Sequence, residues 1–134
     1  MFQLKRSGTL AQRYLFDYNV LSSLKEVKMF FTRPQDFKAK QLAPGINSKL
    51  VWGDRIMLNY NTAEAGASIP THKHPHEQMG MILDGVMIFT IEKETVALKK
   101  GDAFLVPGNV EHSARFEVRT TVMDVFSPPR EDYK

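Results

Sequence analysis

The chain has 134 residues, of which 43% are hydrophobic and 25% charged, which is typical of one folded domain and excludes a disordered or fibrous protein. It contains no cysteine, so disulfide bonds and thiolate metal sites are excluded. No apolar run is long enough to cross a bilayer, and no secretory signal follows Lys5 and Arg6, so we expect a cytoplasmic protein without a membrane partner.

The net charge of +3 is unevenly distributed along the chain. Residues 1–33 carry six basic and two acidic side chains, whereas residues 34–134 carry 12 basic and 13 acidic ones. A nucleic-acid-binding protein is expected to carry its basic surface on the folded domain. The balanced charge of residues 34–134 therefore argues against nucleic acid as a partner.

Residues 1–31 are expected to form an N-terminal extension, and residues 32–134 the main domain. Apolar side chains in the extension recur at three- to four-residue spacing, which permits one amphipathic helix: Leu10, Tyr14, Tyr18 and Leu21. The pattern leaves open whether this extension is ordered or packs against a partner.

From residue 32 onward we expect short β-strands, because stretches of alternating or apolar residues are broken by turn residues such as Gly53-Asp54 and Asp84-Gly85. The expected strands span residues 49–52, 55–61, 69–74, 78–83, 86–91, 95–98, 103–106, 110–116 and 119–126. Short strands at such regular spacing favour an antiparallel sandwich or barrel, and a double-sheet jelly roll fits best.

Four side chains with nitrogen or oxygen donors are candidate metal ligands: His72, His74, Gln78 and His112. On a β-strand His72 and His74 point to the same side, and His112 follows the turn Pro107-Gly108-Asn109. Neutral imidazoles favour Zn, Fe, Ni, Cu or Mn over Mg or Ca. We therefore expect one divalent transition metal per chain inside a small barrel, its identity being left open.

A second group of candidate residues lies near the C-terminus, where Val122, Asp124 and Phe126 share one face of a strand. A buried carboxylate is costly without a partner. Asp124 therefore either caps a loop or pairs with an arginine at the barrel rim, or it faces the metal cavity as an acid/base, with Phe126 as an apolar wall. Arg130 either binds a ligand carboxylate or pairs on the surface with Glu131 or Asp132.

These motifs resemble the cupin superfamily at residues 66–85 and 101–112, where the glycines, histidines and Pro107 have the spacing of its two motifs. The strings HKHPHEQ at 72–78 and DVFSPPREDY at 124–133 resemble the small pectin-degradation cupins of KdgF type. The resemblance implies an all-β cupin double-stranded β-helix, or jelly-roll barrel. It also implies metal ligation by His72, His74, Gln78 and His112, and functional roles for Asp124, Phe126 and Arg130.

Two departures from the cupin pattern bear on the chemistry. The fourth ligand is usually Glu, but here we expect Gln78, because Glu77 falls on the opposite strand face; His76, after Pro75, is expected in the loop instead. An amide leaves the formal charge of the metal site higher than a carboxylate would, which favours Lewis-acid chemistry. In the second motif the glycine comes one position early, and we expect Asn109 to accept the left-handed conformation.

The resemblance implies an enzyme that converts 4,5-unsaturated uronate monosaccharides, which are products of pectin and alginate breakdown, to linear keto forms. The expected partner is a small sugar acid, and a homodimer is expected from the same resemblance. Two alternatives stay open: an Fe(II)-dependent cupin dioxygenase, and a non-catalytic metal- or sugar-binding cupin in which Asp124 is dispensable.

Overall fold

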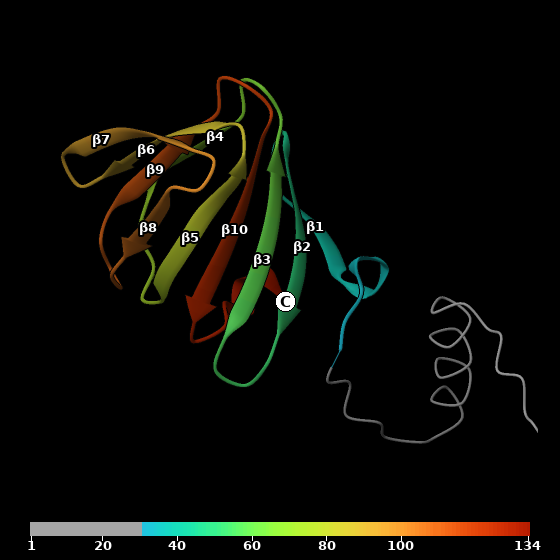
Figure 1. Cartoon of the computed structure of the whole chain (residues 1–134). Helices are drawn as coiled ribbons and strands as arrows, with labels where there is room; N and C mark the ends of the chain where they lie inside the picture. Colours follow the sequence, from blue (N-terminus) through green and yellow to red (C-terminus); the bar gives the residue numbers. More distant parts are fainter. Residues whose placement is uncertain (1–30) are drawn as a thin grey trace, which may run out of the picture. The chain divides into compact units, whose positions relative to one another are not determined.

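The computed structural model describes residues 31–134 (Figure 1), so the helix expected within the N-terminal extension lies outside the described residues. Within residues 31–134 there are ten strands and two short 3₁₀ helices, η1 (Pro34–Asp36) and η2 (Glu131–Tyr133). This part of the chain contains no helix that is long and apolar enough to span a membrane. The expected all-β class is confirmed.

Two antiparallel sheets face each other (Figure 1). The larger sheet contains, in spatial order, β1 (Lys38–Ala43), β2 (Ile46–Trp52), β3 (Met57–Ala63), β10 (Thr120–Ser127), β5 (Glu77–Asp84) and β8 (Ala103–Val106). The smaller sheet contains β4 (Ser68–His72), β9 (His112–Arg115), β6 (Val86–Ile91) and β7 (Glu94–Lys99). This is the expected jelly roll.

The core lies between the inward faces of the two sheets. Every second residue of β10 is buried, which confirms that Val122, Asp124 and Phe126 share the inner face. Ile82 and Val106 from the larger sheet pack with apolar residues of the smaller sheet, which are Met87, Phe89 and Ala114. The two sheets therefore close over an apolar core into which a few polar side chains project.

Several strand limits differ from the sequence-based expectation, and the differences at β1 and β4 have a clear physical cause. β1 was not predicted, because its first residues are mostly exposed and include Lys38 and Lys40, which suit a sheet edge but weaken the apolar signal. β4 ends at His72 rather than at His74, just before Pro75, which has no N–H for the ladder. The His74 carbonyl instead accepts a hydrogen bond from the Asn109 amide at 2.7 Å, which ties this segment to the turn before β9.

That turn has the conformation expected for its unusual sequence. Asn109 has a φ of 65°, so the prediction that Asn109 takes the left-handed conformation is confirmed. Gly108 serves a different purpose, because a Cβ at this position would lie 2.4 Å from the Pro75 carbonyl oxygen. The two histidine-bearing segments can therefore approach closely only because residue 108 has no side chain.

Candidate metal centre and its cavity

Three histidines converge at one end of the barrel interior. His72 ends β4 and pairs in register with His112 at the start of β9, while His74 lies just beyond β4. Potential ligand atoms of the three rings lie within 4.8 Å of one another, and His74 and His112 are buried. The structure thus brings together three of the four candidate ligands although β4 is shorter than expected.

Backbone carbonyls face the Nδ1 atoms of all three rings. The Nδ1 atoms lie 2.9, 3.1 and 2.8 Å from the carbonyl oxygens of Pro70, His76 and Val110, in the order His72, His74 and His112. A carbonyl only accepts, so in neutral His72 and His112 Nδ1–H donates and Nε2 keeps its lone pair. His74 has an acceptor oxygen at each nitrogen, and its Nε2 has a lone pair for a metal in the tautomer with the proton on Nδ1. The Nε2 of His112 is buried without a partner among the described residues.

The electrostatic surroundings keep two of these rings neutral. Burial lowers the pKa of His74 to about 4, and the nearby positive charge of Arg130 and the His112 ring act in the same direction. Burial also lowers the pKa of His112. Neutral imidazoles with free Nε2 atoms are the form in which histidine binds a metal.

Gln78 completes the group from the opposite sheet. It is buried on β5, its Nε2 donates to Asp124 Oδ1 at 3.2 Å, and its Oε1 lies 3.2 Å from His74 Nε2. In the His74 tautomer with the proton on Nδ1, two acceptors face each other, and a cation bound between them would remove their repulsion. The three histidines and Gln78 together fit one divalent transition metal.

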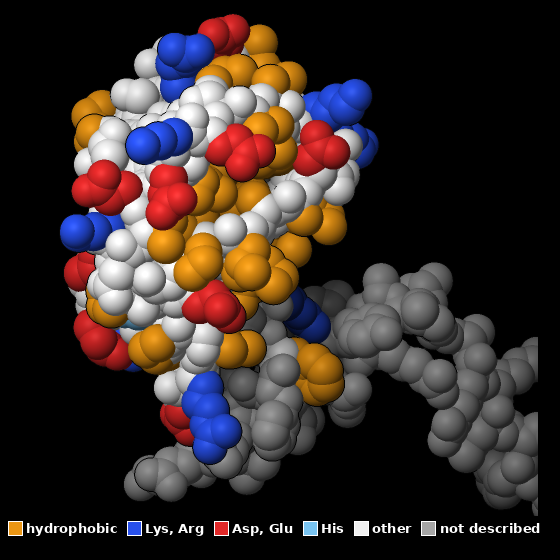
Figure 2. Space-filling model, turned by 90° about the vertical axis from the view of Figure 1, so that its left-hand side faces the viewer, with side chains coloured by type: hydrophobic (Ala, Val, Ile, Leu, Met, Phe, Trp, Pro, Cys, Tyr) orange, Lys and Arg blue, Asp and Glu red, His pale blue; other side chains and the backbone are white. Residues whose placement is uncertain are grey.

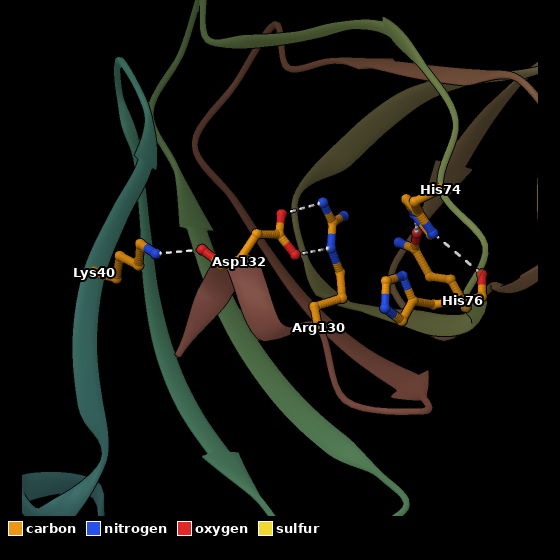
Figure 3. Close-up of polar contacts among 6 residues, drawn as sticks. Lys40, His74, His76, Arg130 and Asp132 are labelled. Atoms are coloured by element: carbon orange, nitrogen blue, oxygen red, sulfur yellow. Dashed lines mark hydrogen bonds and ion pairs between the residues drawn. The ribbon is translucent and has the colours of Figure 1, made fainter.

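The neighbours of Gln78 lie as expected from the strand pattern. Glu77 is exposed on the opposite face of β5. His76 lies in the bend before β5 and is not part of the three-histidine group; its carbonyl oxygen accepts the hydrogen bond from His74 (Figure 3).

Asp124 faces the interior and is held by two amides rather than by an arginine. It is 6% exposed; Oδ1 accepts from Gln78, and Oδ2 accepts from Asn61 Nδ2 at 2.7 Å. Asn61 in turn accepts from the Ser48 hydroxyl. Burial raises the pKa of Asp124 to about 7, although the hydrogen bonds from Gln78 and Asn61 act in the opposite direction. Asp124 can therefore gain or lose a proton near neutral pH.

The strand next to Asp124 leaves room for this carboxyl group. Gly80 on β5 pairs directly with Asp124 on β10, and a Cβ at Gly80 would lie 2.5 Å from Asp124 Oδ1 and 2.3 Å from the Phe104 ring. The missing side chain thus makes space for both a charged and an aromatic neighbour.

The C-terminal segment forms another wall of the cavity (Figure 3). Phe126 is buried, with its ring edge-on to His74 at 5.7 Å between centroids. Arg130 donates from Nε and Nη2 to the Asp132 carboxylate at 3.3 and 2.7 Å, and its Cζ lies 3.9 Å from the centre of the Tyr133 ring. Arg130 therefore forms the ion pair with Asp132 that was one of its two expected roles. It also lines the cavity, and its side chain is only 11% exposed.

Several cavity residues were not found from the sequence: Asn59, Asn61, Phe104 and Tyr133. Asn59 and Asn61 lie two apart on the inner face of β3, whereas Leu58 and Tyr60 point outward. The sequence does show two asparagines at strand spacing, but the apolar residues Leu58 and Tyr60 that alternate with them suggest the opposite orientation of the strand.

Comparisons with known proteins agree with this geometry. The family model described as "Cupin domain" matches residues 60–126. The chain belongs to the cupin family. This cupin is 33% identical over 97 residues to the pectin degradation protein KdgF of Dickeya dadantii, covering 70% of this chain and 88% of that protein, which confirms the resemblance to the KdgF type.

Two further proteins are similar to this cupin. A Bacillus subtilis protein named H2HPP isomerase is 34% identical over 109 residues, which cover 75% of this chain but only 46% of that protein, so the chain spans about half its length. The structure of KdgF from a Halomonas species has a TM-score of 0.73 and 29% identity, covering 78% of this chain and 99% of that one. An RmlC-like cupin from Shewanella frigidimarina, with a TM-score of 0.75, 24% identity and coverage of 80% and 97%, shares the fold.

Proposed function

We propose that this cupin is a metal-dependent enzyme that converts 4,5-unsaturated uronate monosaccharides to linear keto forms. The observation that carries the proposal is the buried Asp124 carboxyl group beside the four candidate metal ligands. The KdgF relatives support the substrate class, and the Bacillus relative named as an isomerase supports a reaction without redox change.

The reaction is an isomerisation that needs two proton transfers. The substrate is a cyclic enol ether with a hemiacetal hydroxyl at C1 and a carboxylate on the double bond. Loss of the C1 hydroxyl proton breaks the bond from C1 to the ring oxygen, which leaves an aldehyde at C1 and an enolate at C5. Addition of a proton at C4 then gives the ketone, so the atoms of substrate and product are the same.

The residues of the cavity suit these steps. A divalent metal held by His72, His74, Gln78 and His112 would supply Lewis acidity toward substrate oxygens. Asp124 would take the hydroxyl proton and later return one, which a carboxyl group with a pKa of about 7 does efficiently near neutral pH.

The C-terminal wall would hold the substrate in place. Nε and Nη2 of Arg130 are engaged by Asp132, so Nη1 is the atom that would reach the uronate carboxylate. The Phe126 ring would pack against the sugar.

The proposal is tested by following the ultraviolet absorbance of the conjugated double bond of unsaturated galacturonate. We expect metal-loaded protein to remove this absorbance faster than the spontaneous reaction, and chelated protein and Asp124→Asn to lose most of the acceleration, by about 100-fold or more for a general acid/base. An Asp124→Asn protein that keeps its metal and its full rate would contradict the role of Asp124. Oxygen consumption under the same conditions would indicate a dioxygenase instead.

A further inference from the structure

Asn59 is a cavity residue to which none of the proposed steps assigns a role. It lies on the inner face of β3, is 1% exposed, and lines the same cavity as Asp124 and Phe126. In the sheet it is directly opposite Leu50 on one side and Asp124 on the other. Asn59 is therefore an amide at the boundary between the polar group around Asp124 and a small apolar cluster, which consists of Leu50, Met57 and Phe126.

The Oδ1 atom of Asn59 is buried, and no described protein group donates a hydrogen bond to it. The register explains why. The ionised Asp124 carboxylate has no hydrogen to donate, and Leu50, the other cross-strand neighbour, has no polar side-chain atom. A buried acceptor without a donor costs stability, so its retention in a core position needs a reason outside the folding of the chain.

We propose that Asn59 is a specificity-determining residue whose Oδ1 accepts a hydrogen bond from a hydroxyl group of the ligand. The acceptor needs a donor, and its neutral amide suits a hydroxyl group. Since Asn59 and Asp124 are cross-strand neighbours, a ligand hydroxyl at Asn59 lies next to the group that is proposed to move the proton. A sugar acid carries several hydroxyl groups and so can reach both. The inference rests on the proposed function for the identity of this ligand.

The effect of Asn59→Leu on stability, gain or loss, distinguishes a role in ligand binding from a structural role. Asn59→Leu replaces an amide by an apolar side chain of similar volume next to Leu50 and Met57. If Asn59 serves the ligand, the metal-loaded variant without ligand should unfold at the same temperature as the wild type or a higher one. If Asn59 holds the barrel together, the variant should be less stable. Asn47→Leu, the same change at an exposed position of the neighbouring strand β2, is the matched control.

The binding experiment uses metal-loaded full-length protein and isothermal titration with D-galacturonate, which lacks the reactive double bond. We expect Asn59→Leu to bind it about tenfold or more weakly than the wild type, as for a polar site that loses its hydrogen-bond partner, and Asn47→Leu to bind it as the wild type does. With the 2-deoxy and 3-deoxy derivatives, the difference between Asn59→Leu and the wild type should disappear for the derivative that lacks the recognised hydroxyl.

The outcomes distinguish this inference from the proposed reaction. Three results would overturn the role of Asn59, whether or not unsaturated galacturonate is converted. The first is equal affinity of Asn59→Leu and wild type for D-galacturonate, and the second is no binding of D-galacturonate by the wild type. The third is a destabilised Asn59→Leu when Asn47→Leu is stable. Weaker, hydroxyl-dependent binding by Asn59→Leu in a protein that converts no unsaturated galacturonate would support the role of Asn59 and refute the enzyme.

Discussion

Asp124 occupies a position on the inner face of β10 where the neighbouring inward residues, Val122 and Phe126, are apolar. Its two hydrogen bonds come from uncharged amides, and no cation compensates its charge in the described part of the chain. Burial therefore destabilises the ionised carboxylate by more than the two hydrogen bonds stabilise it, which is why the pKa of Asp124 rises to about 7. The group is held in a fixed orientation at the expense of stability.

This cost predicts a pH-dependent effect of Asp124→Asn in metal-free protein. Between the unfolded-state pKa of 3.8 and about 7 the folded wild type binds a proton that the unfolded chain lacks, so its stability falls as the pH rises through this range. The asparagine in the variant does not ionise, so the variant does not lose stability in this way. Its free energy of unfolding relative to wild type should therefore rise by up to about 4 kcal/mol from pH 4 to pH 7, measured by urea denaturation.

His74 acts in the opposite sense in both proteins. Its pKa is lowered to about 4, so the folded state excludes a proton that the unfolded chain binds below pH 6.5, and stability rises with pH between these values. This contribution cancels when the variant is compared with wild type at each pH. A difference in stability that is independent of pH would show that Asp124 is not buried as an ionisable group.

At the scale of single residues, the proximity of the four candidate ligands was predictable, whereas the place of Asn59 and Asn61 in the cavity was not. His72, His74, Gln78 and His112 are close in sequence to each other or to a turn, so their spacing carries the information. Asn61 meets Asp124 from 63 residues away along the chain, and such pairing depends on strand order rather than on local pattern. The carboxylate was recognised because Asp is unusual in an apolar strand, whereas asparagine beside Leu58 and Tyr60 was not.

Among the elements, β5 lies between β10 and β8 and is closely packed on its inner face. On its inner face Gln78 and Ile82 are buried, and between them Gly80 leaves space for Asp124 and Phe104. One strand thus contributes a candidate ligand, a core residue and a glycine whose missing side chain leaves room for its neighbours. Its position between two strands leaves little freedom to move away from an added side chain.

Gly80→Ala should therefore destabilise the protein. The added Cβ would lie 2.3 Å from Phe104 and 2.5 Å from Asp124 Oδ1, so at least one of them must shift, which typically costs about 1–3 kcal/mol in a packed core. Urea denaturation would measure the loss. Gly53→Ala is the control, since nothing lies within 4 Å of a Cβ at Gly53, and it should leave stability nearly unchanged. Equal stability of both variants would contradict the close packing around Gly80.

The elements themselves were predicted unequally well. The limits of β6 and β8 agree with those expected, because turn residues such as Asp84-Gly85 and Pro107 mark their ends. β1 was missed because an edge strand needs little apolar surface. The end of β4 was placed too late because the hydrogen bond from the Asn109 amide to the His74 carbonyl cannot be predicted from the local sequence. Strand limits were thus predicted best where turn residues mark them.

At the scale of the whole molecule, the outer face of the larger sheet is unusually apolar for a face turned away from the core. Two cross-strand rows of β3, β10, β5 and β8 contain no charged residue: Leu58, Val125, Met79 and Leu105 in one row, and Tyr60, Met123, Met81 and Ala103 in the other. Figure 2 shows hydrophobic side chains gathered between charged ones on the side where β7 and β8 lie in Figure 1. Such a surface is typical of an interface.

We expect this outer face to pair with a second copy of the chain, because an uncharged surface meets its own copy without electrostatic repulsion. Met79, 54% exposed at the centre of the first row, is the residue to change. Met79→Glu should convert a dimer to a monomer in analytical ultracentrifugation, since two buried carboxylates would oppose each other. Val118→Glu, at a 48% exposed apolar residue outside both rows, should remain dimeric. A dimer for both variants, or a monomeric wild type, would contradict this interface.

The two sheets also contribute differently to the cavity. The three histidines come from the smaller sheet and the segment after β4, and backbone carbonyls orient their rings, whereas Asn59, Asn61, Asp124 and Phe126 come from two strands of the larger sheet. We therefore expect substitutions at Asn59 to leave the orientation of the histidines unchanged. A protein engineer could vary this inward position of β3 to select new ligand preferences while keeping the three histidines, and divergence among related proteins could follow the same route.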